Sequence, residues 1–421
     1  MNAFAIFRPI LQLQKWLKKL KWRHWVLIAL LIFCLLIKCS AYWSMAYTFL
    51  LYPRIGWLLS HLSGIFPFAI GDLFIALSIS WVILYPIYQI GIKKMLTKRG
   101  KILPKNAPLP KKQTVFGHVA EYLLWVYTWF YLAWGLNYSQ PNIFQRMRMM
   151  PAEVSKQTLR NFANRYADSL NMLSEERRVK REEFNGQIDK KDFDSLKERT
   201  RNEVLNGYNQ LNKEPMWMGI NIPFNQHPRV KTMVFTPLSS MAGVTGSMGP
   251  FFCEFTLNGD VLPHEYPATY AHEFAHFLGV ANEGEANFYS YVVCTKSKDK
   301  AVRFSGYYHI FFHVLANVYD ILGVKEGDAL LKRINPKIIA MAKSDRRYWL
   351  SKRCKAIDAA QDFIFDLYLR GNNVKEGRKS YSGVILLILS WEETKSNHKV
   401  QNSKFKVQSS KFKNNEGSII S

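Results

Sequence analysis

The chain has 421 residues, enough for two or three domains, or for one domain together with membrane segments. Lys and Arg outnumber Asp and Glu by 57 to 32, and the resulting formal net charge of +25 indicates an anionic partner such as nucleic acid or a membrane surface. Because the basic residues cluster beside apolar segments and at the C-terminus, we predict contact with inner-membrane lipids and no nucleic-acid partner.

Three apolar stretches predict transmembrane helices, each of which needs about 20 apolar residues. We place these helices at 25–44, 72–92 and 118–138. The third is rich in Trp and Tyr, which favour the membrane–water interface, and Glu121 lies near its start. The first is interpreted as an uncleaved anchor, because its basic leader is long and no small-residue cleavage site follows it.

The charges of the connecting segments predict the orientation in the membrane. The N-terminal arm 1–24 and the linker 93–117 are rich in Lys and Arg, whereas segment 45–71 carries only Arg54. Because basic loops stay in the cytoplasm, the arm and the linker are predicted to be cytoplasmic and 45–71 extracytoplasmic. Three crossings then place the domain at 139–394 outside the membrane.

The predicted extracytoplasmic domain is mainly helical, with a small sheet. Between 228 and 258, β-branched and aromatic residues interrupted by Gly, Ser and Pro predict strands and turns. Apolar periodicity elsewhere predicts helices at 151–173, 193–211, 267–278, 283–295, 300–322, 327–342, 346–370 and 380–391. The fold class is therefore α+β and mostly α. The tail 395–421 contains the tandem repeat VQNSKFK–VQSSKFK and is predicted to be disordered.

The stretch AHEFAH contains the pattern HExxH. Positions i and i+4 share one face of a helix, so His272 and His276 can reach one Zn²⁺ ion. Glu273 is placed to take a proton from zinc-bound water as a general base. Thr269 is the candidate N-cap of this helix, and Gly279 is the candidate stop.

A catalytic zinc site of this kind needs a third protein ligand and one open position. Glu283 begins EGEANF, which resembles the ExxA(D/N) signature on the second helix of gluzincins. That resemblance implies that Glu283 binds zinc and that Asn287 steadies a ligand histidine from outside the ligand set. Glu285 is the alternative third ligand. Asn282 stands where metzincins carry a third histidine, which disfavours that class because Asn is a poor zinc ligand. Imidazole and carboxylate also suit other divalent metals.

Other polar residues near the motif have weaker patterns. His309 and His313 are also spaced i and i+4, but no acid lies between them, so we interpret them as packed rings or as outer partners of the site. His264 and Glu265 precede the motif helix and could approach the site. Glu254, on a predicted strand, could face a substrate.

The chain also resembles an uncharacterised bacterial family of membrane-anchored proteins, a domain of unknown function that carries HExxH. The resemblance covers most of 45–392 and departs at Phe277, where a polar residue commonly follows the second histidine. It rests on FPFAIGD (66–72), WGLNY (134–138), GPFFCEFTLN (249–258), AHEFAH with EGEANF (271–288) and KSYSGVILLI (379–388). The resemblance implies a three-span protein of the bacterial inner membrane with an exported, gluzincin-type zincin domain.

These observations predict a membrane-anchored metallopeptidase that hydrolyses peptide or amide bonds in the cell envelope, with one Zn²⁺ as cofactor. Segment 249–258 is expected to be an edge strand that holds an extended substrate. The alternative is a non-catalytic zinc-binding sensor or scaffold, which would tolerate the loss of Glu273. An intramembrane protease is disfavoured because the motif lies outside the apolar stretches.

Overall fold

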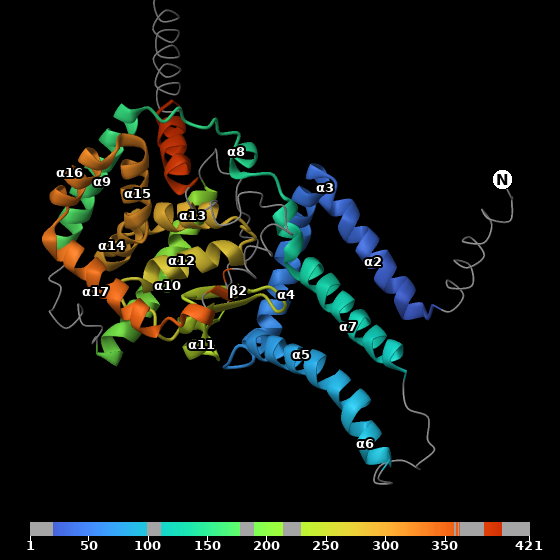
Figure 1. Cartoon of the computed structure of the whole chain (residues 1–421). Coiled ribbons are helices and arrows are strands. Elements are labelled where there is room, and N and C mark those ends of the chain that lie inside the picture. The colour runs from blue at the N-terminus through green and yellow to red at the C-terminus, as the bar shows by residue number, and fades with distance from the viewer. Residues whose placement is uncertain are drawn as a thin grey trace, which may run out of the picture. The chain divides into compact units, whose positions relative to one another are not determined.

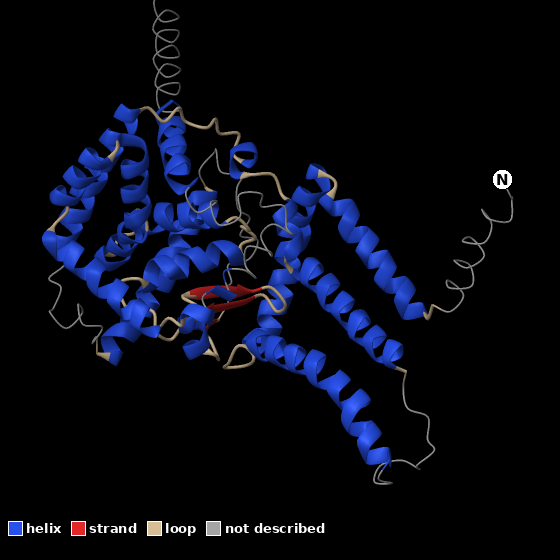
Figure 2. Ribbon diagram, viewed as in Figure 1, coloured by secondary structure: helices blue, strands red, loops and turns tan. Residues whose placement is uncertain are grey.

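The computed structural model describes residues 20–98, 111–176, 189–213, 229–357, 359–360, 362 and 383–397. The chain divides into two compact units, of which unit 1 comprises 1–140 with 249–253, and unit 2 comprises 141–248 with 254–421. The units are mainly helical, and a small sheet precedes the motif helix, as predicted (Figures 1 and 2). The predicted disordered tail 395–421 begins within a helix, since 395–397 are helical, and the rest of it lies outside the described residues.

Unit 1 is built from helices that follow one another closely along the chain. They are α2 (Trp22–Lys38), α3 (Ala41–Ala46), η1 (Tyr47–Leu51), α4 (Tyr52–Gly64), α5 (Ile70–Pro86), η2 (Ile87–Ile92), α6 (Lys93–Lys98), α7 (Lys112–Ala133) and η3 (Gly135–Ser139). Helix α7 contacts α2, α4 and α5, and an ion pair of 2.7 Å joins its Glu121 to Arg23 of α2. The predicted loop 45–71 is mostly helical, since it contains η1 and α4.

The prediction of three transmembrane helices is wrong, because one or two candidate spans are found among the described residues. The continuous helix Ile70–Leu96 has 27 residues, and only 6 % of its most apolar window is buried. Helix α2 and the segment Ala41–Gly64 pass the same test only together, and they are bent by 105°, so they add at most one span. Helix α7 does not pass, since Glu121, His118 and its many Trp and Tyr side chains lower its mean hydropathy.

Unit 2 contains the sheet and the helices that surround the HExxH motif. Its elements are α8 (Ile143–Arg146), α9 (Lys156–Glu176), α10 (Lys190–Asn212), β1 (Val230–Thr232), α11 (Thr236–Met241), β2 (Gly246–Gly249), β3 (Glu254–Leu257), α12 (Tyr266–Phe277), α13 (Glu283–Thr295), α14 (Lys300–His309), α15 (Phe311–Leu322), α16 (Val324–Arg333), α17 (Pro336–Lys352) and a helix at 384–397. The predicted helix 300–322 is interrupted at Ile310, and the predicted strand segment 228–258 also contains α11.

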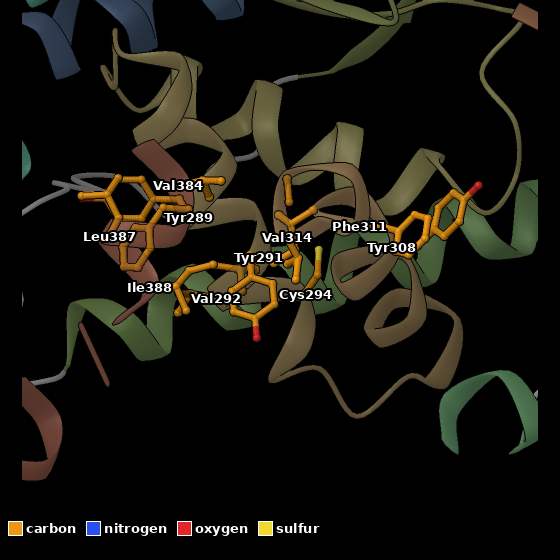
Figure 3. Close-up of a cluster of buried hydrophobic side chains, with 14 of the residues drawn as sticks. Tyr289, Tyr291, Val292, Cys294, Tyr308, Phe311, Val314, Val384, Leu387 and Ile388 are labelled. Carbon is orange, nitrogen blue, oxygen red and sulfur yellow. The ribbon is translucent and has the colours of Figure 1, made fainter. Parts of the chain in front are cut away.

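The core of unit 2 gathers around α13, which is buried along most of its length. Figure 3 shows Tyr289 and Val292 of α13 in one cluster with Val314 of α15 and with Val384 and Leu387 of the helix 384–397. Full burial of such a Val or Leu side chain contributes about 1.5–3 kcal/mol relative to leaving it exposed. Helix α13 is therefore a rigid support for the side chains at its N-terminal end.

The sheet has the strand order β1-β3-β2, and β1 runs parallel to β3 with Val230 opposite Phe255. Every residue of β3 is buried, and the Phe255 ring packs on Tyr270 of α12 at 4.8 Å between centroids. The expectation that 249–258 forms an edge strand is therefore wrong, because β3 is central. The edge strand on the side that faces away from β1 is β2.

Candidate metal centre

Helix α12 presents the motif from a well-defined start. It begins at Tyr266, with Glu265 as the N-cap residue and Pro267 in its first turn. Proline suits this place because it has no N–H to leave unpaired and its φ fits a helix. The predicted N-cap, Thr269, lies inside the helix, where its hydroxyl donates to the carbonyl of Glu265 at 3.0 Å. That prediction was wrong by about one turn.

The end of α12 is a glycine turn that reverses the chain. Gly279 has a φ of 92°, a conformation that glycine adopts without strain. Its N–H donates to the carbonyl of His276 at 3.0 Å, and the N–H of Val280 donates to the carbonyl of Ala275 at 3.1 Å. This paired pattern is the Schellman motif. The turn allows the short connection 278–282 to bring the start of α13 back against the motif.

Three ligand-type atoms converge between α12 and α13, and we call their residues, His272, His276 and Glu283, the metal cluster. The Nε2 atom of His272 lies 3.1 Å from Nε2 of His276 and 3.1 Å from Oε2 of Glu283. The distance from His276 Nε2 to that carboxylate oxygen is 3.5 Å. A tetrahedral zinc ion with ligands at about 2.0–2.1 Å would separate its ligand atoms by about 3.3 Å. The spacing of the three atoms therefore fits zinc.

The outward-facing nitrogens of both histidines have hydrogen-bond partners. His276 Nδ1 lies 2.6 Å from the carbonyl oxygen of Val280, which can only accept, so Nδ1 carries a proton. His272 Nδ1 lies 2.8 Å from Oδ1 of Asn287, and this oxygen also receives His309 Nε2 at 2.9 Å. In the neutral rings the lone pairs of both Nε2 atoms then point into the cluster, as metal binding requires.

The charges in the metal cluster attract a cation. Burial alone would lower the pKa of His276, but the Glu283 carboxylate beside it raises that pKa to about 9. Although burial opposes it, the two histidines hold the pKa of Glu283 well below its usual range. At neutral pH a proton on His276 thus occupies the place where a metal ion would bind, since one positive charge there satisfies all three groups.

Glu273 lies beside the metal cluster and is 6 % exposed. A Cβ placed on Gly246 of β2 would come within 2.5 Å of the Glu273 side chain, so only a glycine allows this close approach. The carboxylate accepts a hydrogen bond from the backbone N–H of Met248, also on β2. Burial raises the pKa of Glu273 despite the nearby histidines. The predicted general base is therefore held between the motif helix and an edge strand.

Glu285, the alternative third ligand, faces away from the two histidines. Its carboxylate forms an ion pair of 2.5 Å with Arg146, and it accepts the backbone N–H of Ile143 at 2.9 Å. The side chains of Arg146 and Glu285 are 1 % and 7 % exposed. Asn282 is the N-cap of α13 and accepts the N–H of Glu285 at 3.0 Å. The geometry brings Glu283, and not Glu285, to the histidines.

The other polar candidates divide between the metal cluster and the rest of unit 2. Burial and the nearby His272 and His313 lower the pKa of His309 to about 3, so it stays neutral as a partner of Asn287. Glu254 instead forms a buried ion pair of 2.5 Å with Lys231. The sequence does not predict the approach of Gly246 to Glu273 or the hydrogen bond between the Val280 carbonyl and His276, because no motif links Gly246 or Val280 to the site.

His264 and Glu265 also lie outside the metal cluster. Together with Asp345 of α17 they form a second group, which we call the His264 cluster. His264 Nε2 lies 2.8 Å from Oδ2 of Asp345, and the Tyr308 hydroxyl donates to the same oxygen at 2.5 Å. The Trp349 indole donates to the Glu265 carboxylate at 3.1 Å.

Comparison with models of known families shows which family the chain belongs to. A family model matches residues 47–389. The chain belongs to the family described as "Protein of unknown function (DUF3810)". The predicted membership of a family of unknown function is thereby confirmed. The curated proteins and the solved structures contain no match to this DUF3810 chain.

Proposed function

We propose that this DUF3810 protein is a membrane-anchored zinc metallopeptidase that hydrolyses peptide or amide bonds in the cell envelope. The supporting observation is the convergence of His272 Nε2, His276 Nε2 and Glu283 Oε2 to within 3.1–3.5 Å. Because the remaining ring nitrogens are bonded to Asn287 and Val280, these three atoms are available to bind one ion. This leaves a fourth position for water or substrate.

Glu273 would act as the proton carrier of the reaction. A zinc ion in the metal cluster would supply Lewis acidity and make water a stronger acid. Glu273 would accept the proton of the attacking water and return it to the leaving amine nitrogen. Burial, which raises the pKa of Glu273, favours this role because the carboxyl group must hold a proton between the two steps. The Met248 N–H keeps the carboxylate in place.

Strand β2 would position an extended substrate. It is an edge strand, and its Gly246 contacts Glu273. Main-chain hydrogen bonds along such an edge hold peptides in many complexes. Pairing there would bring a peptide bond close to both the carboxylate and the metal cluster.

The membrane anchor is proposed to include the helix Ile70–Leu96. At about 1.5 Å per residue it is longer than the hydrocarbon core of about 30 Å. Its exposed side chains include Ile79, Ile83, Leu84 and Ile87, which favour lipid over water. We propose the bacterial inner membrane, with unit 2 on the extracytoplasmic side. A single crossing by Ile70–Leu96 from a cytoplasmic N-terminal arm gives this orientation, and it puts the basic linker 93–117 on the extracytoplasmic side, contrary to the prediction for that linker. A reporter fused after residue 397 tests this, because activity of a cytoplasm-dependent reporter there would overturn the assignment.

The direct test is zinc content and peptidase activity of the full chain, purified in detergent. About one zinc per chain is expected in wild type and in Glu273→Gln, and none in His272→Ala. Hydrolysis is expected in wild type, reduced about 10²–10⁴-fold in Glu273→Gln and absent in His272→Ala. Folded wild type without bound zinc would overturn the proposal. Zinc binding together with unchanged cellular function of Glu273→Gln would favour a sensor or scaffold.

A further inference from the structure

A pocket lies in unit 2, away from the metal cluster. It has a volume of about 600 Å³ and is formed by α10, the first half of α12, the strand β1 and the end of β3. Its lining includes Phe193, Lys197, Arg201, Arg229, Tyr266 and Tyr270. Strands β1 and β2 are at opposite edges of the sheet, and β2 is the strand that contacts Glu273. The pocket is therefore separate from the proposed catalytic site.

Positive charge predominates in the lining of this pocket. Arg201 and Arg229 are both exposed there, and Arg201 forms no ion pair with any residue that the structure describes. Two lysines of the lining already have acidic partners: Lys197 pairs with Asp194 at 3.0 Å, and Lys231 pairs with Glu254. Arg201 thus supplies charge that remains available to a ligand, and Arg229 adds to the positive potential of the pocket.

Tyr270 gives the pocket an unsatisfied polar group. The residue is 1 % exposed and lines the pocket, and its buried hydroxyl has no hydrogen-bond partner in the described part of the chain. The Arg201 guanidinium acts electrostatically on this hydroxyl, so the hydroxyl and the guanidinium share one region of the pocket. Buried hydroxyl groups are nearly always hydrogen-bonded, and a bound acceptor would satisfy this one.

We propose that the pocket binds a phosphate ester with an apolar organic part. The phosphate would lie against Arg201, because the guanidinium fork matches phosphate oxygens, and Arg229 would add to the positive potential around it. The Tyr270 hydroxyl would donate to a phosphate oxygen. The organic part would pack on the rings of Phe193 and Tyr266. A volume of about 600 Å³ is typical of small-molecule sites.

The test is calorimetric titration of the full chain in an uncharged detergent with two probes. Phenyl phosphate represents a soluble ester, and monomeric dihexanoyl phosphatidic acid represents a lipid headgroup. Saturable binding of at least one probe is expected, weakened about tenfold or more in Arg201→Gln. The probe that depends on Arg201 identifies the source. Arg199→Gln is the matched control, since Arg199 is also on α10 but bonds to Asp299 at 2.8 Å, and it should bind as wild type does.

Two further variants test whether the pocket, and not the metal cluster, holds the phosphate. Tyr270→Phe should weaken binding severalfold without lowering thermal stability, because the hydroxyl that it removes has no partner in the described structure. His272→Ala should bind the probe as wild type does, which excludes phosphate bound at the metal cluster. Absence of saturable binding of both probes, or binding that Arg201→Gln leaves unchanged, would overturn the proposal.

Discussion

Two groups of histidine and carboxylate side chains flank helix α12, and they differ in how their protons are arranged. His264 and Glu265 of the His264 cluster precede the helix, whereas the histidines of the metal cluster lie in its second half. In the His264 cluster, Asp345 accepts from His264 and from the Tyr308 hydroxyl, so donors face an acceptor. In the metal cluster the donors point outward to Asn287 and Val280, so acceptors face one another.

The difference shows that residue types and proximity alone do not define a metal site. Within each cluster, taken separately, the candidate ligand atoms lie within 4.8 Å of one another. A hydrogen-bonded cluster is already satisfied, whereas converging lone pairs repel until a cation or a proton binds between them. We therefore expect zinc in the metal cluster and hydrogen bonds alone in the His264 cluster.

Replacing one histidine by alanine, first in one cluster and then in the other, should give the largest difference in zinc content. His272→Ala is expected to abolish zinc binding in metal analysis of the purified chain, because it removes a ligand. The loss should exceed the roughly 10–100-fold that removal of an outer partner costs. His264→Ala should keep about one zinc per chain and lower the unfolding temperature, since it leaves the buried Asp345 short of a donor. Zinc lost equally in both variants would contradict the comparison.

The sequence predicts the pair of histidines well, since HExxH on a helix is a local pattern. It does not decide between Glu283 and Glu285, because the decisive partner of Glu285 is Arg146, 139 residues away in the chain. The transmembrane count failed for a different, local reason. The Trp and Tyr residues of α7 were interpreted as interfacial anchors, but its overall hydropathy is too low for the helix to qualify alone.

The outer hydrogen bonds of the metal cluster are the next test. Asn287→Ala removes the oxygen that holds both His272 and His309, so zinc affinity is expected to fall by about 10–100-fold. Competition with a zinc chelator measures this. Asn287→Asp is the control, because a carboxylate accepts the same two bonds and should restore the affinity. An unchanged affinity in Asn287→Ala would mean that the ring of His272 is held by packing alone.

Zinc binding should also depend on pH in a defined direction. Although burial alone would lower it, Glu283 raises the pKa of His276 to about 9, above the usual value for histidine, so zinc must displace a proton at lower pH. Affinity is therefore expected to rise about tenfold per pH unit up to about 9 and then to level off. In the metal-free protein the same proton stabilises the fold below about pH 6.5, and this stabilisation is lost as the pH rises through about 9.

Proton release on zinc binding checks that prediction directly. Titration calorimetry in buffers with different ionisation enthalpies should show about one proton released near neutral pH. In Glu283→Gln, at zinc concentrations high enough to saturate the weakened site, the release should shift to lower pH, since Glu273 is then the only carboxylate left to raise the pKa of the buried His276. Release that stays the same in this variant would assign the proton to another group.

The smallest effect is expected from Tyr308→Phe, which tests the His264 cluster without touching a histidine. The change removes the hydroxyl that donates to Asp345 at 2.5 Å and leaves the bond from His264 in place. The free energy of unfolding should fall by about 1.5–3 kcal/mol, the range for a hydrogen bond to a charged group, and zinc content should not change. Denaturant unfolding with parallel metal analysis separates the two outcomes. If the His264 cluster instead held an ion, the variant would lose bound metal, because Asp345 is held in place by that hydroxyl and would be the ligand disturbed.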